Sequence, residues 1–453
     1  MLVRITKDIK SKLLGGDERS SLAKKNILFS LLFKATAMLS SFVMVPITLT
    51  MLNQEIYGVW LTISSILFWF TFFDVGLGSG MRNYLAAALT RNDMSLARRY
   101  ISTTFILLFM IALVVGVCCC LFVPFLDMNK IFNTQMESNN VLMYSMLVAL
   151  LATLIFFAIR NVGTIYISMQ LPAVNDGLAV AGNVLSLVIV WILSVTATGN
   201  LFTVVIVFTV TPVVVYMTAA VFTFTKHKEL CPSLKHMDLS LGHNIISKGL
   251  GFFLIQITSC LVIYGSSNVF VTQYCGPQEV TNYGIAYKLF NLLFVAYSVY
   301  ITPFWNAYTD AAVLNDYEWM KKSFKKTLGM WALSVVGGIA LLIISPWFFD
   351  KWVGGNANIS WELSGITLLY ICMVNLNSCV TFLLNGLNII RVQIWTSLVF
   401  TVFYLIAVLL FGNKCGVVGI VSMMTIAYMG MIIVHFYQCH LILNGKASGI
   451  WIK

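Results

Sequence analysis

Charged residues are scarce in this sequence. Only 10% of its 453 residues are Asp, Glu, Lys or Arg, whereas soluble domains approach roughly a quarter. Hydrophobic residues make up 59% of the chain, and the mean hydropathy is +0.89. This composition excludes an ordinary soluble domain and predicts an all-α polytopic membrane protein.

Motifs for catalysis and for metal binding are also lacking. The sequence has no Walker A lysine motif, no Ser/His/Asp set and no solvent-accessible carboxylate pair. Its ten cysteines have neither metal-ligand nor disulfide spacing. We therefore expect a protein that is not an enzyme and holds no metal or cofactor, with coupling to a proton or sodium gradient left open.

Apolar runs between Pro, Gly and charge breaks predict twelve membrane spans, in two six-helix lobes around a central cavity. The spans cover residues 26–52, 57–80, 99–124, 141–165, 173–195, 201–224, 244–272, 282–306, 327–349, 362–387, 389–411 and 416–437. The predicted organisation is a basic tail over 1–25, an N-terminal lobe over 26–224, a linker over 225–243, a C-terminal lobe over 244–437 and a second tail over 438–453.

Acidic residues are fewer than basic ones, 17 against 28, which gives a net charge of +11. The basic residues concentrate in alternate loops: twenty-one fall on one predicted side and three, Lys130, Lys351 and Lys414, on the other. Such an asymmetry predicts that both termini are cytoplasmic, and it accounts for the charge without nucleic acid. An even number of spans per lobe gives the two lobes one orientation, related by an axis along the membrane normal.

A stretch from Tyr57 to Tyr100 recurs, weakly, in the second half. Tyr57-Gly58 is repeated as Tyr283-Gly284, and Asn92-Asp93 is repeated as Asn315-Asp316, at nearly the same offset along the chain. A near-constant offset favours two halves of similar fold, although short matches also arise by chance in apolar sequences.

Four basic residues fall inside predicted spans: Lys34, Arg160, Lys248 and Lys288. Lys248 is near a helix start, where its side chain can snorkel to the interface. Charge in the hydrocarbon region is costly, so the surplus of cations predicts an interior that meets an anionic substrate group such as a pyrophosphate. Asn291 could extend this site, or serve only as interhelical glue.

Two acidic residues also fall within spans, Asp74 and Asp176. Either could pair with Arg160, which is the purely structural alternative. We expect them to act as gate or ion-coupling groups.

The sequence resembles the polysaccharide-repeat-unit flippases, the O-antigen and capsule translocases of the multidrug/oligosaccharidyl-lipid/polysaccharide exporter superfamily. The motifs cover roughly residues 24–105 and are Tyr57-Gly-Val-Trp60, Asp74-Val-Gly-Leu-Gly78, Met81-Arg82-Asn83 and Arg99-Tyr100-Ile-Ser-Thr103. The resemblance implies two six-helix lobes, alternating access, and transfer of an undecaprenyl-pyrophosphate-linked oligosaccharide to the periplasmic leaflet of a bacterial inner membrane.

It also implies membrane lipids, a polysaccharide polymerase and a chain-length regulator as partners. The implied cationic cavity would be supplied by Lys34, Arg160 and Lys288. A multidrug exporter of organic cations is the alternative, and it should have a carboxylate-dominated cavity. A membrane polymerase or acyltransferase is disfavoured because no catalytic constellation is found.

Overall fold

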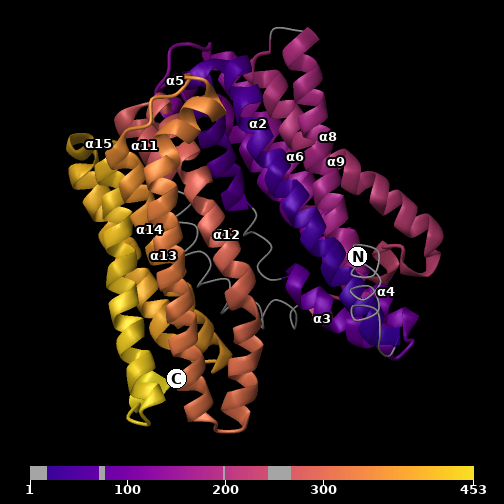
Figure 1. The fold of residues 1–453 in the computed structure, drawn as a ribbon. Coiled ribbons are helices and arrows are strands. Elements are labelled where there is room, and N and C mark those ends of the chain that lie inside the picture. Colours follow the sequence, from indigo (N-terminus) through magenta and orange to yellow (C-terminus); the bar gives the residue numbers. More distant parts are fainter. Residues whose placement is uncertain (1–17, 71–76, 197–198, 243–266, 453) are drawn as a thin grey trace, which may run out of the picture. The chain divides into compact units, whose positions relative to one another are not determined.

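The computed structural model describes residues 18–70, 77–196, 199–242 and 267–452, and within these ranges the regular structure is entirely helical (Figure 1). Two of the predicted site residues, Asp74 and Lys248, lie outside the described residues. The α-helices are α2 (Glu18–Phe70), α3 (Leu77–Thr90), α4 (Met94–Phe122), α5 (Met128–Phe132), α6 (Asn139–Ile159), α7 (Asn161–Ser168), α8 (Pro172–Thr196), α9 (Leu201–Lys226), α11 (Ser267–Cys275), α12 (Pro277–Val313), α13 (Tyr317–Val353), α14 (Trp361–Gly386) and α15 (Arg391–Leu443).

Nine helical segments in the described ranges are long and apolar enough to cross a membrane. Two of them, α2 and α15, are 53 residues long and are each interrupted at one residue, Asn53 and Gly416. Each therefore accounts for two predicted spans. Most of the seventh predicted span, 244–272, lies in the undescribed range. Each of the other predicted spans overlaps a helix, but α12 and α13 extend several residues beyond the predicted spans 282–306 and 327–349.

Helix α15 is a hairpin that reverses at Gly416, whose φ of 61° is accessible to glycine. The hydroxyl of Thr396 lies 2.7 Å from the imidazole Nε2 of His435, which joins the two arms. A Cβ on Gly430 would lie 2.1 Å from the ring of Phe400, so glycine permits the close approach of the arms.

The predicted loop from Met81 is helical as far as Thr90 because the run Tyr84–Thr90 is rich in alanine, the strongest helix former. The chain then turns at Asn92, where φ is 56°, and the carboxylate of Asp93 caps α4 by accepting from the Leu96 amide at 2.9 Å. Asparagine tolerates this left-handed conformation better than most residues.

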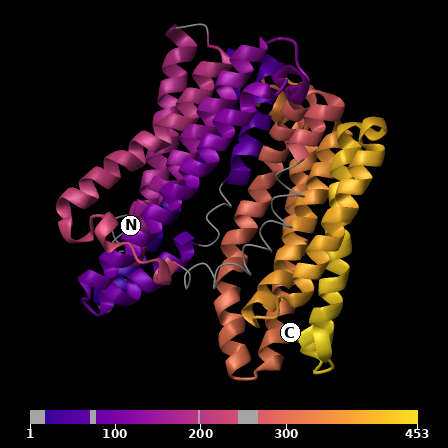
Figure 2. The same ribbon diagram turned by 180° about the vertical axis from the view of Figure 1, so that it is seen from behind.

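The same turn recurs between α12 and α13 (Figure 2). Asn315 has a φ of 55°, and Asp316 accepts from the Trp319 amide at 2.9 Å. Even the backbone bond that closes the turn is repeated: Asp93 N–H donates to Ala88, and Asp316 N–H donates to Ala311.

Other helix boundaries are repeated at similar offsets. Asn53 and Gly276 both have a positive φ, and each precedes a helical segment. These two residues are as far apart in the sequence as Asn92 and Asn315. Ser138 caps α6 and Ser360 caps α14, each by accepting an amide N–H with its hydroxyl. The internal duplication indicated by the sequence is therefore also present in the local backbone geometry.

The described residues form two compact units. Unit 1 holds those within 1–51, 70–127 and 138–253, and unit 2 holds those within 52–69, 128–137 and 254–453. The second arm of α2 thus packs in unit 2, although it precedes the rest of the N-terminal spans in the chain. The linker packs in unit 1.

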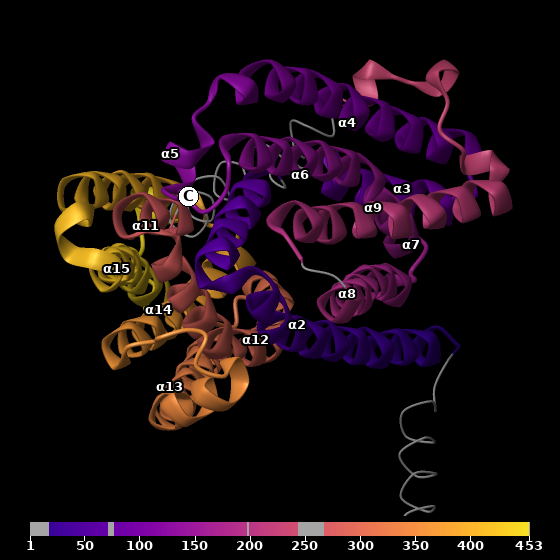
Figure 3. The ribbon, with the colours of Figure 1, turned by 90° about the horizontal axis from the view of Figure 1, so that it is seen from above.

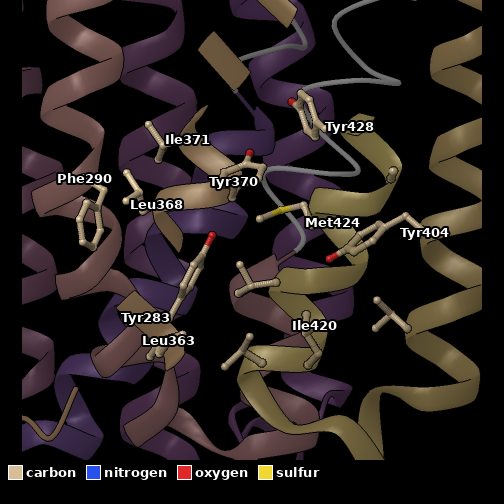
Figure 4. Packing of buried hydrophobic residues seen from close by; sticks show 14 of the residues in the cluster. Tyr283, Phe290, Leu363, Leu368, Tyr370, Ile371, Tyr404, Ile420, Met424 and Tyr428 are labelled. Carbon is tan, nitrogen blue, oxygen red and sulfur yellow. The ribbon is translucent and has the colours of Figure 1, made fainter. Parts of the chain in front are cut away.

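Each unit has its own apolar core. In unit 1, Leu85 of α3, Leu108 of α4 and Phe157 of α6 are buried in one cluster, and α4, α6 and α9 lie side by side (Figure 3). In unit 2 the core joins α12, α14 and both arms of α15. Its members include Phe290, Tyr370, Tyr404 and Met424 (Figure 4).

Candidate functional site

Unit 2 contains a polar cavity of about 310 Å³, which we call the Lys288 cavity. Its walls come from the second arm of α2, from α11 and from α12. The lining residues are Tyr57, Leu61, Ser64, Ser65, Phe68, Ser267, Asn268, Tyr283, Gly284, Tyr287, Lys288 and Asn291.

The two main walls of this cavity occupy equivalent positions in the two repeats. With the offset that relates Asn92 to Asn315, Ser65 corresponds to Lys288 and Phe68 corresponds to Asn291. Leu61 with Gly284 and Ser64 with Tyr287 are two further such pairs among the lining residues. In transporters built from repeats, substrate sites commonly lie between equivalent elements of this kind.

Beyond the cavity, the same two helices meet in a seam whose contacts are reciprocal. The Thr281 hydroxyl donates to the Gln54 carbonyl oxygen at 2.6 Å, and a Cβ on Gly58 would lie 1.8 Å from the Pro277 carbonyl oxygen. In the register of Asn92 and Asn315, Gln54 and Gly58 are the repeat equivalents of Pro277 and Thr281, so the sequence match of Tyr57-Gly58 to Tyr283-Gly284 is out of register with the structural repeat. A local pseudo-two-fold axis therefore relates these two helices.

Contacts around the axis are polar as well as close. The Gln278 amide lies 3.4 Å from the carboxylate of its repeat equivalent, Glu55. Next to this seam, the Asn268 amide of α11 donates to the Ser65 hydroxyl at 2.7 Å. The two helices are related by symmetry in their backbones but differ in charge. Among the described lining residues, the only ionisable one besides tyrosine is Lys288, which belongs to α12.

Lys288 is half-buried, and no carboxylate of the described residues makes an ion pair with it. The residue before it, Tyr287, donates its hydroxyl to the side-chain oxygen of Asn291, one helical turn further along α12, at 3.2 Å. An ammonium group inside a membrane protein is stabilised by a negative partner. The cavity can therefore bind an anionic group at Lys288 and hydrogen-bond hydroxyl groups through its tyrosine, serine and asparagine side chains.

A second polar cavity, of about 390 Å³, lies in unit 1. Arg160, at the break between α6 and α7, lines it together with Arg82 of α3, and the Arg160 guanidinium lies 5.6 Å from the centre of the Phe157 ring. The rest of the lining is Gly78, Phe156, Asn161, Thr164, Ile167, Asn175 and Tyr216.

The repeat equivalents of these two arginines are aromatic. The offset between Asn92 and Asn315 relates Arg82 to Trp305, and the offset between Ser138 and Ser360 relates Arg160 to Phe382. The rings of Trp305 and Phe382 pack edge to face at 5.5 Å. The cationic pair in unit 1 is therefore not a requirement of the fold.

The predicted site residues are only partly brought together. Lys288 and Asn291 share one cavity, and Arg160 lines the other. Asp176 lies on α8, beside the lining residue Asn175, and Lys34 is exposed on α2 and lines neither cavity.

Sequence reasoning missed several lining residues, among them Arg82 and Asn268. It assigned Arg82 to a loop, although the alanine-rich run that follows predicts a helix. The repeat offset pairs Ser65 with Lys288 and could have identified Ser65 from the sequence. Among the described residues, no cluster of His, Cys, Asp and Glu could hold a metal ion.

Comparison with known proteins identifies the fold. An inward-facing MATE multidrug resistance transporter of the MOP superfamily superposes with a TM-score of 0.72 and 15% identity, over 91% of this chain and 96% of that one. The lipid II flippase MurJ, in an inward closed conformation, matches with a TM-score of 0.68 and 13% identity, over 91% and 87% of the two chains. This chain therefore has the fold of these two transporters.

Sequence comparison gives a weak likeness to another transporter. A Salmonella typhimurium protein named "Putative O-antigen transporter" is 19% identical over 355 residues, which cover 76% of this chain and 79% of that protein. No family model matches the sequence. These relatives are transporters and flippases, not enzymes.

Proposed function

We propose that this protein is a flippase that moves an undecaprenyl-pyrophosphate-linked oligosaccharide, the repeat unit of an O-antigen or related surface polysaccharide, from the cytoplasmic to the periplasmic leaflet. The observation that carries the proposal is the Lys288 cavity, in which one ammonium group is surrounded by hydrogen-bonding side chains. The likeness to an O-antigen transporter and to a lipid II flippase supports the same substrate class.

The chemistry of such a substrate matches the cavity. A pyrophosphate carries about two negative charges, and moving unpaired charge through a membrane interior costs several kcal/mol. Lys288 offsets part of this cost by a charge-assisted hydrogen bond. Tyr287 and Asn268 present polar groups that sugar hydroxyls can bind, and tyrosine rings offer apolar faces to a sugar.

The alternative is an exporter of organic cations. Such a cargo is expected to need a carboxylate-dominated cavity, and neither of these two cavities has an Asp or Glu in its lining. A cavity with a lysine, or with two arginines, repels a cation. The anionic cargo is therefore favoured.

Purified protein in proteoliposomes tests the proposal. Lipid-linked oligosaccharide on both leaflets is exposed to an impermeant glycosidase, and a fluorescent organic cation is assayed in parallel. We expect the inner-leaflet glycan to become accessible only when the protein is present, while the organic cation stays where it is. Movement of the cation with continued protection of the glycan would contradict the proposal and support the exporter.

The proposed setting is a bacterial inner membrane, where a polysaccharide polymerase and a chain-length regulator would receive the translocated unit. Coupling to a proton or sodium gradient belongs to the same proposal. Imposing each gradient separately across the proteoliposomes tests this point.

A further inference from the structure

The linker between the two sets of spans is fastened to a polar face at the start of α4. Arg98 Nε donates to the Cys231 carbonyl oxygen at 2.9 Å, and the Ser233 amide donates to the Ser102 hydroxyl at 3.1 Å. Further along, Arg99 forms an ion pair with Asp238. Hydrogen bonds from Ser240 and Arg99 hold the pKa of Asp238 below its ordinary value, so the ion pair is intact at neutral pH.

Beside this attachment lies an apolar groove of about 620 Å³, formed by α4, the ends of α6 and α9, and the linker. Its lining includes Phe105, Phe109, Met110, Leu113 and Phe224, and the linker contributes Pro232 and Leu234.

The groove opens onto an apolar surface. Leu113 is 68% exposed, and Val117 and Leu121, one and two turns further along α4, are exposed as well. In a membrane protein, an exposed apolar stripe on a span faces lipid chains. Leu234 of the linker is 78% exposed, which brings an apolar side chain of the linker to the same boundary.

Two cations lie next to the linker residues that line the groove. Lys235 follows Leu234 and is exposed, and Arg98 is tied to the linker residue just before Pro232. The nearby carboxylates are engaged elsewhere: Asp238 pairs with Arg99, and Glu229 lies 3.3 Å from His227. The feature thus combines an apolar groove with two cations beside its linker residues.

We propose that this groove is a binding site for an anionic glycerophospholipid of the leaflet on the linker side, with one acyl chain between α4 and α9 and the phosphate at Arg98 and Lys235. Hydrocarbon gains little by leaving the bilayer for a groove, so selectivity arises from the headgroup. One lysine near a membrane surface contributes about 1 kcal/mol, or roughly a five-fold preference for an anionic lipid. The bound lipid would hold the linker against α4.

The test measures lipids retained by full-length protein after reconstitution in equal amounts of phosphatidylglycerol and phosphatidylethanolamine, followed by detergent extraction and mass spectrometry. We expect phosphatidylglycerol to be enriched about five-fold. Lys235→Gln should remove most of the enrichment, and Met110→Trp should reduce it by filling the groove. The matched controls are Lys322→Gln, an exposed lysine of α13, and Val117→Trp, on the exposed stripe outside the groove.

Equal retention of the two lipids, or the same loss in the control variants, would overturn the proposal. Displacement of phosphatidylglycerol by added polyprenyl phosphate would also overturn it and assign the groove to an isoprenoid chain. Because Lys235 is a surface residue, its variant is expected to fold, so the test does not depend on Met110→Trp. The outcome is independent of glycan movement, which tests the proposed flippase activity separately.

Discussion

Lys288 and Lys34 illustrate how differently two intramembrane lysines can be placed. Both interrupt apolar runs in the sequence, yet Lys288 lines a polar cavity and Lys34 is exposed on α2. Helix packing, rather than depth in the span, decides which one can meet a cargo inside unit 2. Lys34 stays a predicted substrate contact, and the structure adds no cavity around it.

At the residue scale, Lys288→Ala should slow glycan movement by about ten- to a hundred-fold, because a hydrogen bond to a charged group is worth about 1.5–3 kcal/mol. Lys288→Arg should retain much of the activity, and Lys288→Glu should remove it by repelling the pyrophosphate. The measurement is the initial rate in proteoliposomes, with the exposed Lys322→Ala as the control. Equal rates for the Ala, Arg and Glu variants would contradict a role for the charge.

At the scale of elements, the seam between the second arm of α2 and α12 is a close helix contact beside the Lys288 cavity. Gly58 permits it, since any larger side chain would collide with the Pro277 backbone. Gln54, Glu55 and their partners add hydrogen bonds along the seam. The seam holds two walls of the cavity in register.

Gly58→Ala should therefore lower the free energy of unfolding by about 1–3 kcal/mol, the usual cost of overpacking. Gly329→Ala in α13 is the matched control, because no atom outside the neighbouring backbone of its own helix lies within 4 Å of a Cβ built there. The control should be neutral or gain up to about 1 kcal/mol from the higher helix propensity of alanine. Thermal unfolding in detergent measures both. A seam that tolerates Gly58→Ala as well as the control would show that these helices separate at little cost.

At the scale of the whole molecule, the chain is two repeats of one helical pattern. The turns at Asn92 and Asn315 and the caps at Ser138 and Ser360 recur with the same geometry. Such a parallel repeat predicts that the corresponding turns face the same side of the membrane. The basic residues near these turns predict that this side is the cytoplasm.

Single cysteines at Arg91, Lys235 and Lys322 should therefore be shielded from impermeant thiol reagents in intact cells, in a background without the ten native cysteines. All three positions are exposed on the protein, so shielding would come from the membrane. A cysteine at Lys351, on the opposite predicted side, should be labelled and serves as the positive control. Labelling of any of the first three from outside would contradict the shared orientation.

The ends of α3, α12 and α13 lie outside the predicted spans, but the sequence by itself determined the membrane helices and the repeat. These depend on short-range causes: apolar length, the capping carboxylates of Asp93 and Asp316, and asparagine at the left-handed turns. Each cause acts within a few residues, so it can be recognised without knowledge of the neighbours.

Only the tertiary structure decided which face of each helix lies inward. These helices are apolar nearly all round, so their sequences carry little amphipathic signal to orient them. It also decided that the second arm of α2 packs with α12 in unit 2, which places Ser65 across a cavity from its repeat equivalent, Lys288. That arrangement results from contacts between residues far apart in the sequence, such as the bond between Asn268 and Ser65, and no local pattern specifies it.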